Sequence, residues 1–398
     1  MNDADLFRGI RVADFSQGIA GPYSGQLLAQ YGAEVIKIEP PAGDWVRGIG
    51  RRFGDHTSLA MMASRGKRSL ALDIRKPEGR RIARQLIDRA DVVIENNRPG
   101  VMARLGLDYE TVKRPELIYL AVTGFGQQSP HKDRPATDTI VQAFTGMAVA
   151  NAMPDGAPHR VGMLVPDPVT ALYGFQAVAL ALYGRAMGRG GRYLDVSLTQ
   201  SMAALQAYKL IEATLGSGKQ EALAVPSGTF RTADGWLTTA VVTEEQWRRL
   251  GPALGRPEIV GDPRWTTPDG RRANKDPLLA LMHEVFAARG TEDWLQRLGQ
   301  ADILANRVNG YAEFLADPHV AATGTVAWID HPEIGRVPMA GIPAAALPGQ
   351  GAPAICPAIG EHSRAVLGEL GLDAAAIEAL IRAGVVTEPQ ATATAVPA

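Results

Sequence analysis

One carboxylate, Asp167, stands at the start of a long apolar run, between two prolines in the stretch Val165-Pro166-Asp167-Pro168. Aspartate is a preferred helix N-cap and proline suits the first helical position, so the pattern predicts that Asp167 caps a helix that begins at Pro168. A carboxylate in that place can also act as a nucleophile. The helix dipole favours its charged form, and an aspartate of ordinary pKa is ionised at neutral pH without an activating base. On pattern alone, the capping role is the stronger interpretation.

Arginine and lysine side chains gather between residues 51 and 104, several of them just after predicted strands. Open α/β sheets bind ligands at the carboxyl ends of their strands, and arginine recognises phosphate. A phosphate-bearing ligand would explain Arg75, Arg98 and Arg104, although exposure to solvent explains them equally well. A solvated helix face is the simpler interpretation for three more: Arg80, Arg81 and Arg84.

Several common kinds of site are absent from the sequence. The glycines of the first strand-to-helix turn, Gly18, Gly21 and Gly25, miss the G-x-G-x-x-G spacing of a dinucleotide site. The histidines form no H-x-x-x-H pattern, so no metal site is predicted. A formal net charge of -1 gives no pull toward nucleic acid, and every long apolar stretch is interrupted before it could span a membrane. The single Cys356 excludes internal disulfides and fits a reducing cytoplasm.

The elements that must position these residues follow an alternating pattern in the first half of the chain. Apolar strand-like runs alternate with amphipathic helices, which predicts an α/β fold with an open, mostly parallel, Rossmann-like sheet. A hairpin signal at Asp234-Gly235 and three helical patterns after it predict a smaller, inserted α+β domain at residues 220–322. We expect residues 1–219 and 323–386 to form the large domain, and residues 387–398 to be a disordered tail.

Six blocks of the sequence resemble, in order, the class III CoA-transferases, the family that includes formyl-CoA transferase, carnitine CoA-transferase and α-methylacyl-CoA racemase. The blocks are GIRVADFSQGIAGPYSGQLLAQYGAEVIKIE from Gly9, SRGKRSLALDIRKPEGRRIARQLIDRADVVIENNRPGVMARLGLDYE from Ser64, LIYLAVTGFGQ from Leu117, the stretch around Asp167, GRGGRYLDVSLTQSM from Gly188, and PAIGEHSRAVLGELG from Pro357. The resemblance covers the chain to about residue 386. It implies the fold of this family and an interlocked homodimer.

The resemblance changes the interpretation of Asp167, because the aspartate at this place in the family is the catalytic nucleophile. It implies that Asp167 both caps its helix and attacks the thioester of an acyl-CoA. A mixed anhydride and then an aspartyl-CoA thioester would follow, from which CoA passes to an acceptor carboxylate. Coenzyme A and acyl-CoA are then substrates, and no permanently bound cofactor and no metal are implied.

Contacts to CoA also follow from the resemblance. They are expected at Leu72, Arg75, Asn96, Asn97 and Arg104. Pro40 stands where formyl-CoA transferase has an arginine, and Arg47 is the candidate replacement for that phosphate contact.

Two expected substrate contacts, Ile19 and Thr137, depart from relatives. Formyl-CoA transferase has a glutamine and a tyrosine at these places, which disfavours formate and oxalate as substrates. The racemase branch needs a histidine where Thr137 stands, and threonine cannot shuttle a proton at neutral pH. An acyl-CoA racemase and a catalytically silent CoA-binding protein remain alternatives to a CoA-transferase.

Basic residues near the second predicted strand could hold a second carboxylate, which would suggest a dicarboxylic acid as substrate. A solvated loop explains them as well. They are Arg47, Arg51, Arg52 and Arg65.

Overall fold

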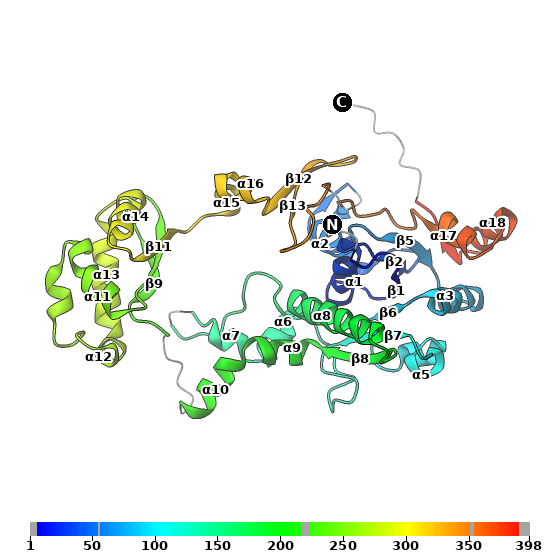
Figure 1. Cartoon of the computed structure of the whole chain (residues 1–398), viewed down its shortest axis with the longest axis horizontal. Helices are drawn as coiled ribbons and strands as arrows, with labels where there is room; N and C mark the ends of the chain where they lie inside the picture. The colour runs from blue at the N-terminus through cyan, green and yellow to red at the C-terminus, as the bar shows by residue number, and fades with distance from the viewer. Residues whose placement is uncertain (1–5, 55, 154, 217–222, 351–353, 390–398) are drawn as a thin grey trace. The chain divides into compact units, whose positions relative to one another are not determined.

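The computed structural model describes residues 6–54, 56–153, 155–216, 223–350 and 354–389 (Figure 1). The chain divides into two compact units. One unit takes in Met1–Leu210 and Ala322–Ala398, and the other takes in Ile211–Ala321. The predicted domain boundary at residues 219–220 lies outside the described residues.

A seven-stranded sheet with the order β14-β5-β2-β1-β6-β7-β8 forms the centre of the larger unit. These strands are β14 (Val386–Thr387), β5 (Arg68–Leu72), β2 (Glu34–Glu39), β1 (Arg11–Asp14), β6 (Val92–Glu95), β7 (Ile118–Thr123) and β8 (Arg192–Ser197). All neighbouring strands pair in parallel except β14, which is antiparallel to β5. The predicted α/β class with an open, mostly parallel, Rossmann-like sheet is therefore confirmed.

The edge strand β14 shows that the predicted disordered tail does not start at Thr387. Thr387, which we expected to be disordered, pairs with Ala71 of β5, and Glu388 forms an ion pair with Arg364 at 2.5 Å. Backbone pairing at the sheet edge orders these residues although they lack large apolar side chains. Residues 390–398 of the predicted tail lie outside the described residues.

Helices and short strands connect the strands of the sheet. They are α1 (Ala20–Gln30), β3 (Arg52–Phe53), β4 (His56–Thr57), α2 (Ser58–Ser64), α3 (Pro77–Arg89), α4 (Val101–Leu105), α5 (Tyr109–Val112), α6 (Asp138–Phe144), α7 (Met147–Ala150), α8 (Pro166–Ala186), α9 (Leu198–Leu205), α10 (Ala207–Leu215), α17 (Ser363–Glu369) and α18 (Ala374–Arg382). A separate antiparallel pair, β12 (Val326–His331) and β13 (Gly335–Ala340), follows the smaller unit in the chain.

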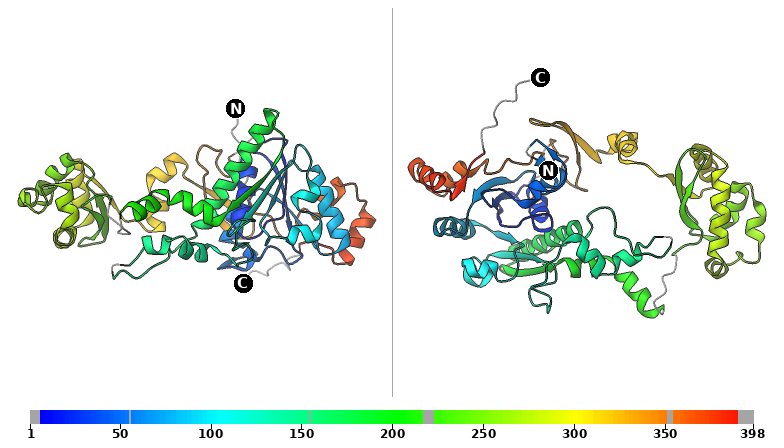
Figure 2. Two further views of the ribbon diagram at one scale, coloured as in Figure 1. Left: turned by 90° about the horizontal axis from the view of Figure 1, so that it is seen from below. Right: turned by 180° about the vertical axis from the view of Figure 1, so that it is seen from behind.

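Helices cover both faces of the sheet (Figure 2). Successive strand residues point to opposite sides, so each face has apolar side chains that the helices bury. Ala13 and Val93 pack into a core with α3, α17 and α18. Their neighbours Val12 and Val92 pack into a second core with α1, α8 and α9. Burial on both sides explains why these strands are continuous apolar runs in the sequence.

Helices α1 and α8 approach each other closely. The Ser24 hydroxyl of α1 donates to the carbonyl oxygens of Ala20 and Ala171, each at 3.0 Å. A Cβ at Gly174 of α8 would lie 2.6 Å from the Ser24 Oγ, so only glycine fits there. The contact fixes the position of α8, which carries Asp167 in its first turn.

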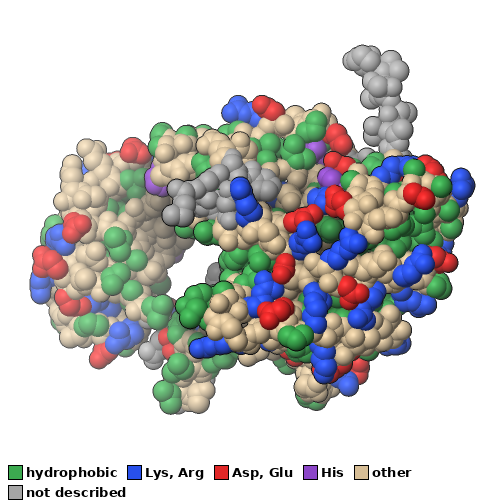
Figure 3. Space-filling view, turned by 45° about the vertical axis from the view of Figure 1, so that its right-hand side comes forward, with side chains coloured by type: hydrophobic (Ala, Val, Ile, Leu, Met, Phe, Trp, Pro, Cys, Tyr) green, Lys and Arg blue, Asp and Glu red, His purple; other side chains and the backbone are tan. Residues whose placement is uncertain are grey.

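Charged side chains on the face drawn in Figure 3 are of both signs and lie interspersed. The arginines of α3 follow this pattern: Arg81 is exposed, and Arg84 pairs with Asp88 at 2.8 Å. Salt bridges of this exposed kind contribute little to stability. The interpretation of these arginines as a solvated helix face is confirmed.

The smaller unit combines an antiparallel sheet with helices. Its elements are β9 (Ser227–Arg231), β10 (Trp236–Ala240), α11 (Glu244–Leu254), α12 (Pro268–Ala273), α13 (Lys275–Ala287), α14 (Thr291–Gln300), β11 (Leu304–Arg307), α15 (Tyr311–Ala316) and α16 (Pro318–Thr323), of which the last ends in the larger unit. Arg231 pairs with Trp236 across the predicted Asp234-Gly235 turn. The hairpin and the α+β character of this unit were thus predicted correctly.

Candidate active site

Asp167 lies in the first turn of α8, but it does not cap the helix as predicted. The helix begins at Pro166, with Val165 at the N-cap position, and Asp167 makes no capping hydrogen bond with its side chain. Pro166 takes the first helical position because its fixed φ already suits a helix. Asp167 is thereby the second residue of the helix rather than its cap.

A different carboxylate accepts the amides at this helix end. Asp138, the first residue of α6, accepts hydrogen bonds through Oδ2 from the backbone N–H groups of Val165 at 2.8 Å and Asp167 at 3.1 Å. Its other oxygen accepts from Gln142 Nε2 at 2.7 Å, and only 3% of Asp138 is exposed. Asp138 therefore holds the start of α8 from a separate helix.

Burial, together with the nearby charge of Asp138, raises the pKa of Asp167 to about 7. This overturns the expectation of an ordinary aspartate that is fully ionised at neutral pH. Removal from water disfavours the charged form more than the helix dipole favours it. A carboxylate with such a pKa is a stronger base and nucleophile when ionised, and is partly protonated at pH 7.

The strand order of the central sheet reverses between β1 and β6. The turn formed by Ser16, Gln17 and Gly18 lies at the carboxyl ends of these two strands. Open α/β sheets bind ligands at this position. The Gln17 N–H donates to Asn96 Oδ1 at 2.7 Å, and Asn96 Nδ2 donates back to the Gln17 carbonyl at 2.6 Å. Both ends of the Asn96 amide therefore hold the turn, and one Nδ2 hydrogen and one Oδ1 lone pair remain available to a ligand.

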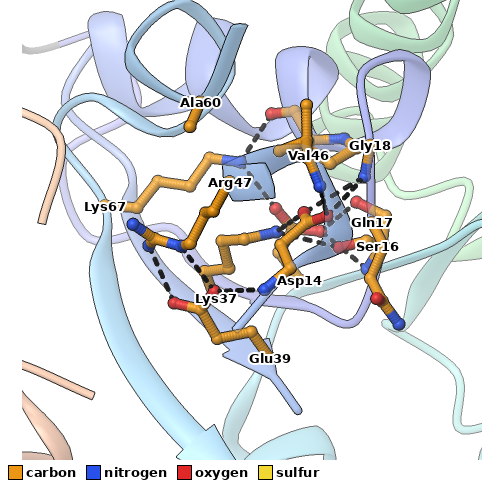
Figure 4. Close-up of polar contacts among 12 residues, drawn as sticks. Asp14, Ser16, Gln17, Gly18, Lys37, Glu39, Val46, Arg47, Ala60 and Lys67 are labelled. Atoms are coloured by element: carbon orange, nitrogen blue, oxygen red, sulfur yellow. Dashed lines mark hydrogen bonds and ion pairs between the residues drawn. The ribbon is translucent and has the colours of Figure 1, made fainter. Parts of the chain in front are cut away.

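Asp44 holds the same turn from the other side. Its two oxygens accept from the Gly18 N–H at 2.9 and 3.1 Å, and Lys37 Nζ donates to Asp44 at 2.7 Å and to the Ser16 carbonyl at 3.0 Å (Figure 4). Gly18 has a φ of +80°, and a Cβ there would collide with the Trp45 ring. The turn is thus restrained at three successive residues.

A buried charge network extends from this turn into the core (Figure 4). Lys67 Nζ lies 2.7 Å from Asp14 Oδ2, and both side chains are fully buried. Burial lowers the pKa of Lys67 to about 8, and Asp14 opposes that effect. The network has three carboxylates and three cations, so its charges balance: Asp14, Lys37, Glu39, Asp44, Arg47 and Lys67.

Arg47 belongs to this network, which corrects the expectation that it meets a phosphate or a second carboxylate. Its guanidinium binds Glu39 through two hydrogen bonds at 2.8 and 2.9 Å and donates to the Pro357 carbonyl at 3.0 Å. Ser69 Oγ completes the Glu39 site at 2.6 Å. With 6% of its surface exposed, Arg47 has its counter-ion inside the protein.

The other expected CoA contacts lie after β5 and β6. Leu72 ends β5 with 1% exposure and packs in the core, so only its backbone can meet a ligand. Arg75 is exposed and paired with Asp73 at 2.8 Å. The Asn97 N–H and Nδ2 donate to Glu95 at 2.8 and 3.3 Å, and Arg104 is exposed in the last turn of α4.

The two expected substrate contacts lie at helix N-cap positions. Ile19 precedes α1 and is 4% exposed, and it belongs to a small apolar cluster with Val46 and Leu164. Leu164 stands three residues before Asp167, so this cluster joins the turn at Gly18 to the start of α8. Thr137 precedes α6, is exposed, and makes no capping hydrogen bond with its side chain.

Sequence reasoning missed Asp138, although it selected the adjacent Thr137. An aspartate in the first turn of a helix is common, and its two amide donors lie more than 25 residues away in the chain (165 − 138 = 27). The described part of the chain contains no cluster of three or more His, Cys, Asp or Glu side chains that could hold a metal ion. None of its helices is long and apolar enough to cross a bilayer.

Comparison with known proteins places this architecture among acyl-CoA enzymes. The family model described as "CoA-transferase family III" matches residues 7–363. A succinyl-CoA–D-citramalate CoA-transferase of Chloroflexus aurantiacus is 32% identical over 91% of this chain and 93% of its own. A succinate–glutarate CoA-transferase of Agrobacterium fabrum is 33% identical over 91% of this chain and 95% of its own.

A solved structure shares the fold as well. The crystal structure of a CAIB/BAIF family protein from Brucella suis matches with a TM-score of 0.79 and 32% sequence identity, over 92% of this chain and 99% of that one. The family model, the relatives and the fold agree over nearly the whole chain. The protein is therefore a CoA-transferase that uses CoA thioesters as substrates, and it belongs to CoA-transferase family III.

Proposed function

We propose that the protein moves CoA from an acyl-CoA to a second carboxylic acid through covalent intermediates on Asp167. The observation that carries the proposal is the partly buried Asp167 carboxylate at the start of α8, with no cation paired to it in the described residues and its pKa raised to about 7. Such a group is reactive toward a thioester carbonyl without needing a separate base. The named substrates of the relatives are carboxylic acids and their CoA thioesters.

Four displacements complete the exchange. The Asp167 carboxylate attacks the acyl thioester, which forms a mixed anhydride and releases CoA thiolate. The thiolate attacks the aspartyl carbonyl of the anhydride, which releases the first acid and leaves an aspartyl-CoA thioester. The acceptor carboxylate attacks this thioester and frees the thiolate, which then takes the new acyl group and regenerates the Asp167 carboxylate. No water is consumed, and excluding water protects both intermediates.

Helix geometry supports the role of the surrounding groups. Pro166 and Pro168 have no N–H, and the N–H groups of Val165 and Asp167 donate to Asp138, so the first turn of α8 favours negative charge at Asp167 through the helix dipole rather than through free amides. We propose that CoA lies along the carboxyl ends of β5, β1 and β6. Its nucleotide would contact the Leu72 backbone, Arg75, Asn97 and Arg104, and its pantetheine would pass the restrained turn at Gly18.

A racemase activity is the less favoured alternative. Proton removal at the α-carbon needs a second acid or base opposite Asp167, and the side chain expected there, Thr137, cannot titrate near neutral pH. Thr137 lies beside Asp138, but Asp138 is occupied by two backbone amides and Gln142. Uptake of solvent deuterium at the α-carbon without exchange of CoA would identify the racemase.

Covalent trapping tests the proposal directly. Hydroxylamine added with acyl-CoA should convert Asp167 to a hydroxamate, because it intercepts an aspartyl anhydride or thioester. Peptide mass spectrometry locates the modification. Hydroxylamine alone, and the Asp167→Ala variant with acyl-CoA, are the controls that should stay unmodified. A hydroxamate at a different residue, or none while CoA transfer proceeds, would rule out the aspartyl intermediate.

We also propose a homodimer. Helix α8 and its C-cap residue expose a stripe of large apolar side chains, which are 52% to 67% exposed: Leu172, Leu180, Tyr183 and Met187. Helical spacing places all four on one side of α8, and a second copy of the chain is the occupant we propose. Sedimentation should give twice the mass of one chain. The single Cys356, buried and free, supports a reducing cytoplasm as the location.

A further inference from the structure

Four arginines were candidates for binding a second carboxylate, and the structure separates them. Arg47 already has a partner in Glu39. Arg51 is exposed and lies over the Phe53 ring at 5.3 Å, and Arg52 is exposed in β3. Arg65 differs from all three, because it is 4% exposed and forms no ion pair with a described residue.

The contacts of Arg65 leave its charge without a counter-ion. Both terminal nitrogens donate to the Ala340 carbonyl oxygen at 3.2 Å, and the buried Nε has no hydrogen-bond partner among the described residues. A carbonyl dipole compensates a buried cation only in part, and buried arginines are normally paired with an anion. The edge of a guanidinium that includes Nε binds a carboxylate through two parallel hydrogen bonds when such an anion is present.

Packing connects Arg65 to the region of Asp167. Arg65 ends α2 and interacts electrostatically with Tyr23 of α1. Tyr23 packs against the same apolar cluster as Ile19 and Leu164. Leu164 is three residues from Asp167, so about 10 Å of chain at most separates them. Arg65 therefore lies on the side of the site that Ile19 and Tyr23 border.

We propose that Arg65 binds the second carboxylate of a dicarboxylic acid, and so selects dicarboxylic acids over monocarboxylic acids at this site. The proposal rests on the proposed function, since the first carboxylate of the same acid would be the one that exchanges CoA on Asp167. A dicarboxylate supplies the anion that Arg65 lacks. An acid with a methyl group in its place leaves the cation buried and unpaired.

Matched acids test the selection. Transfer from succinyl-CoA to glutarate is compared with transfer from butyryl-CoA to pentanoate, since each pair differs by a methyl group in place of a carboxylate. The Arg65→Gln variant should lose about 100-fold in kcat/KM for the dicarboxylic pair and change less than about threefold for the other. Arg51→Gln removes an exposed arginine and is the control, with both pairs unchanged. Arg65→Lys should restore only part of the loss.

Two results would overturn the proposal while leaving the proposed function intact. One is a wild-type enzyme that uses butyryl-CoA and pentanoate as well as succinyl-CoA and glutarate. The other is an equal loss for both pairs in Arg65→Gln. Absence of transfer with every acid would instead contradict the proposed function.

A binding measurement keeps the proposal testable if the variant does not fold. In wild-type protein, glutarate should raise the melting temperature and pentanoate at the same concentration should not. Equal effects of the two acids would rule out a role for Arg65 in recognising a second carboxylate.

Discussion

Two groups of buried carboxylates lie at the same end of the central sheet, and they are compensated in opposite ways. In the charge network, burial alone would raise the pKa of Asp14, but Lys67 and Lys37 outweigh it and hold that pKa below its usual value. At the start of α8, no cation of the described residues pairs with Asp138 or Asp167, and the pKa of Asp167 rises to about 7. Each carboxylate of the network has a cation beside it, and Asp167 has none among the described residues.

This difference separates structural from chemical roles. A carboxylate with a lysine at 2.7 Å, such as Asp14 or Asp44 of the network, gains nothing by attacking a thioester. The partly desolvated Asp167 carboxylate loses an unfavourable charge when it becomes acylated. We infer that the network fixes the turn at Gly18, and that the missing cation at Asp167 is what makes that residue reactive.

The largest effect is expected from Asp167→Asn, which keeps the shape of the side chain and removes its nucleophile. Transfer of CoA should fall by about 10⁴-fold or more, because no covalent intermediate can form. Affinity for CoA should change by less than about threefold, since the neighbouring contacts remain. Exchange is followed by mass spectrometry and affinity by calorimetry. Retention of even a tenth of the wild-type rate would contradict the assigned role.

Breaking the charge network should affect stability instead. Lys67→Met removes the ion pair of the buried Asp14 and leaves Lys37 as its nearby cation, and should lower the free energy of unfolding by about 3–5 kcal/mol. Urea titration followed by circular dichroism measures this change. The control is Lys113→Met, which removes an exposed lysine paired with Glu110 and should change nothing measurable. Similar results for the two variants would show that the network does not stabilise the fold.

The neighbour of Asp167 should control the pH dependence. Wild-type kcat/KM should rise with pH through about 7, because attack requires the ionised carboxylate. Asp138→Asn removes a negative charge next to Asp167 and should move the midpoint down by up to about one pH unit. Gln142→Ala disturbs the hydrogen bonds of Asp138 without changing charge, and should leave the midpoint in place. A common midpoint in all three proteins would exclude the electrostatic coupling.

The smallest effect is a gain in stability at the active site. The pKa of Asp167 is raised in the folded protein, so between about pH 4 and 7 the unfolded chain gives up a proton that the folded protein keeps. The stability that this group provides is therefore complete below pH 4 and is lost as pH rises to 7. The side chain in Asp167→Asn stays uncharged at every pH, so this variant does not lose stability as pH rises. It should be about 1 kcal/mol more stable than wild type at pH 8.

Comparing unfolding at two pH values checks the sign of this effect. At pH 4 the asparagine variant and the wild type should unfold at nearly the same urea concentration, because Asp167 is then protonated in the folded protein. A variant that is less stable than wild type at pH 8 would mean that the folded protein favours the charged carboxylate.

Much of the fold could be predicted because its strands are buried on both sides. The first three residues of β6, at 92–94, are all apolar, and the hairpin at Asp234-Gly235 has a standard turn sequence. Asp167 was identified from its place between two prolines and from the family resemblance. Local pattern and resemblance were sufficient for these features.

The remaining features depend on contacts between distant segments. The backbone N–H groups of Val165 and Asp167 donate to Asp138, which belongs to another helix. The local sequence therefore predicted that Asp167 caps the helix, although Asp138 accepts these hydrogen bonds instead. Arg47 looked available because its partner, Glu39, reaches it only once the chain has turned back after β2. Charge compensation of this kind is decided by folding and has no signature in sequence spacing.

Close packing of Gly174 against Ser24 has a mechanical consequence for turnover. Helix α8, which carries Asp167, and helix α1, which follows the restrained turn, are in direct contact here, and a Cβ at Gly174 would lie 2.6 Å from the Ser24 Oγ. Under the proposed mechanism, this contact would hold Asp167 and the turn at a constant spacing through the four displacements. The movement that admits one acid and releases another must then occur in the bound molecules or in other segments of the chain.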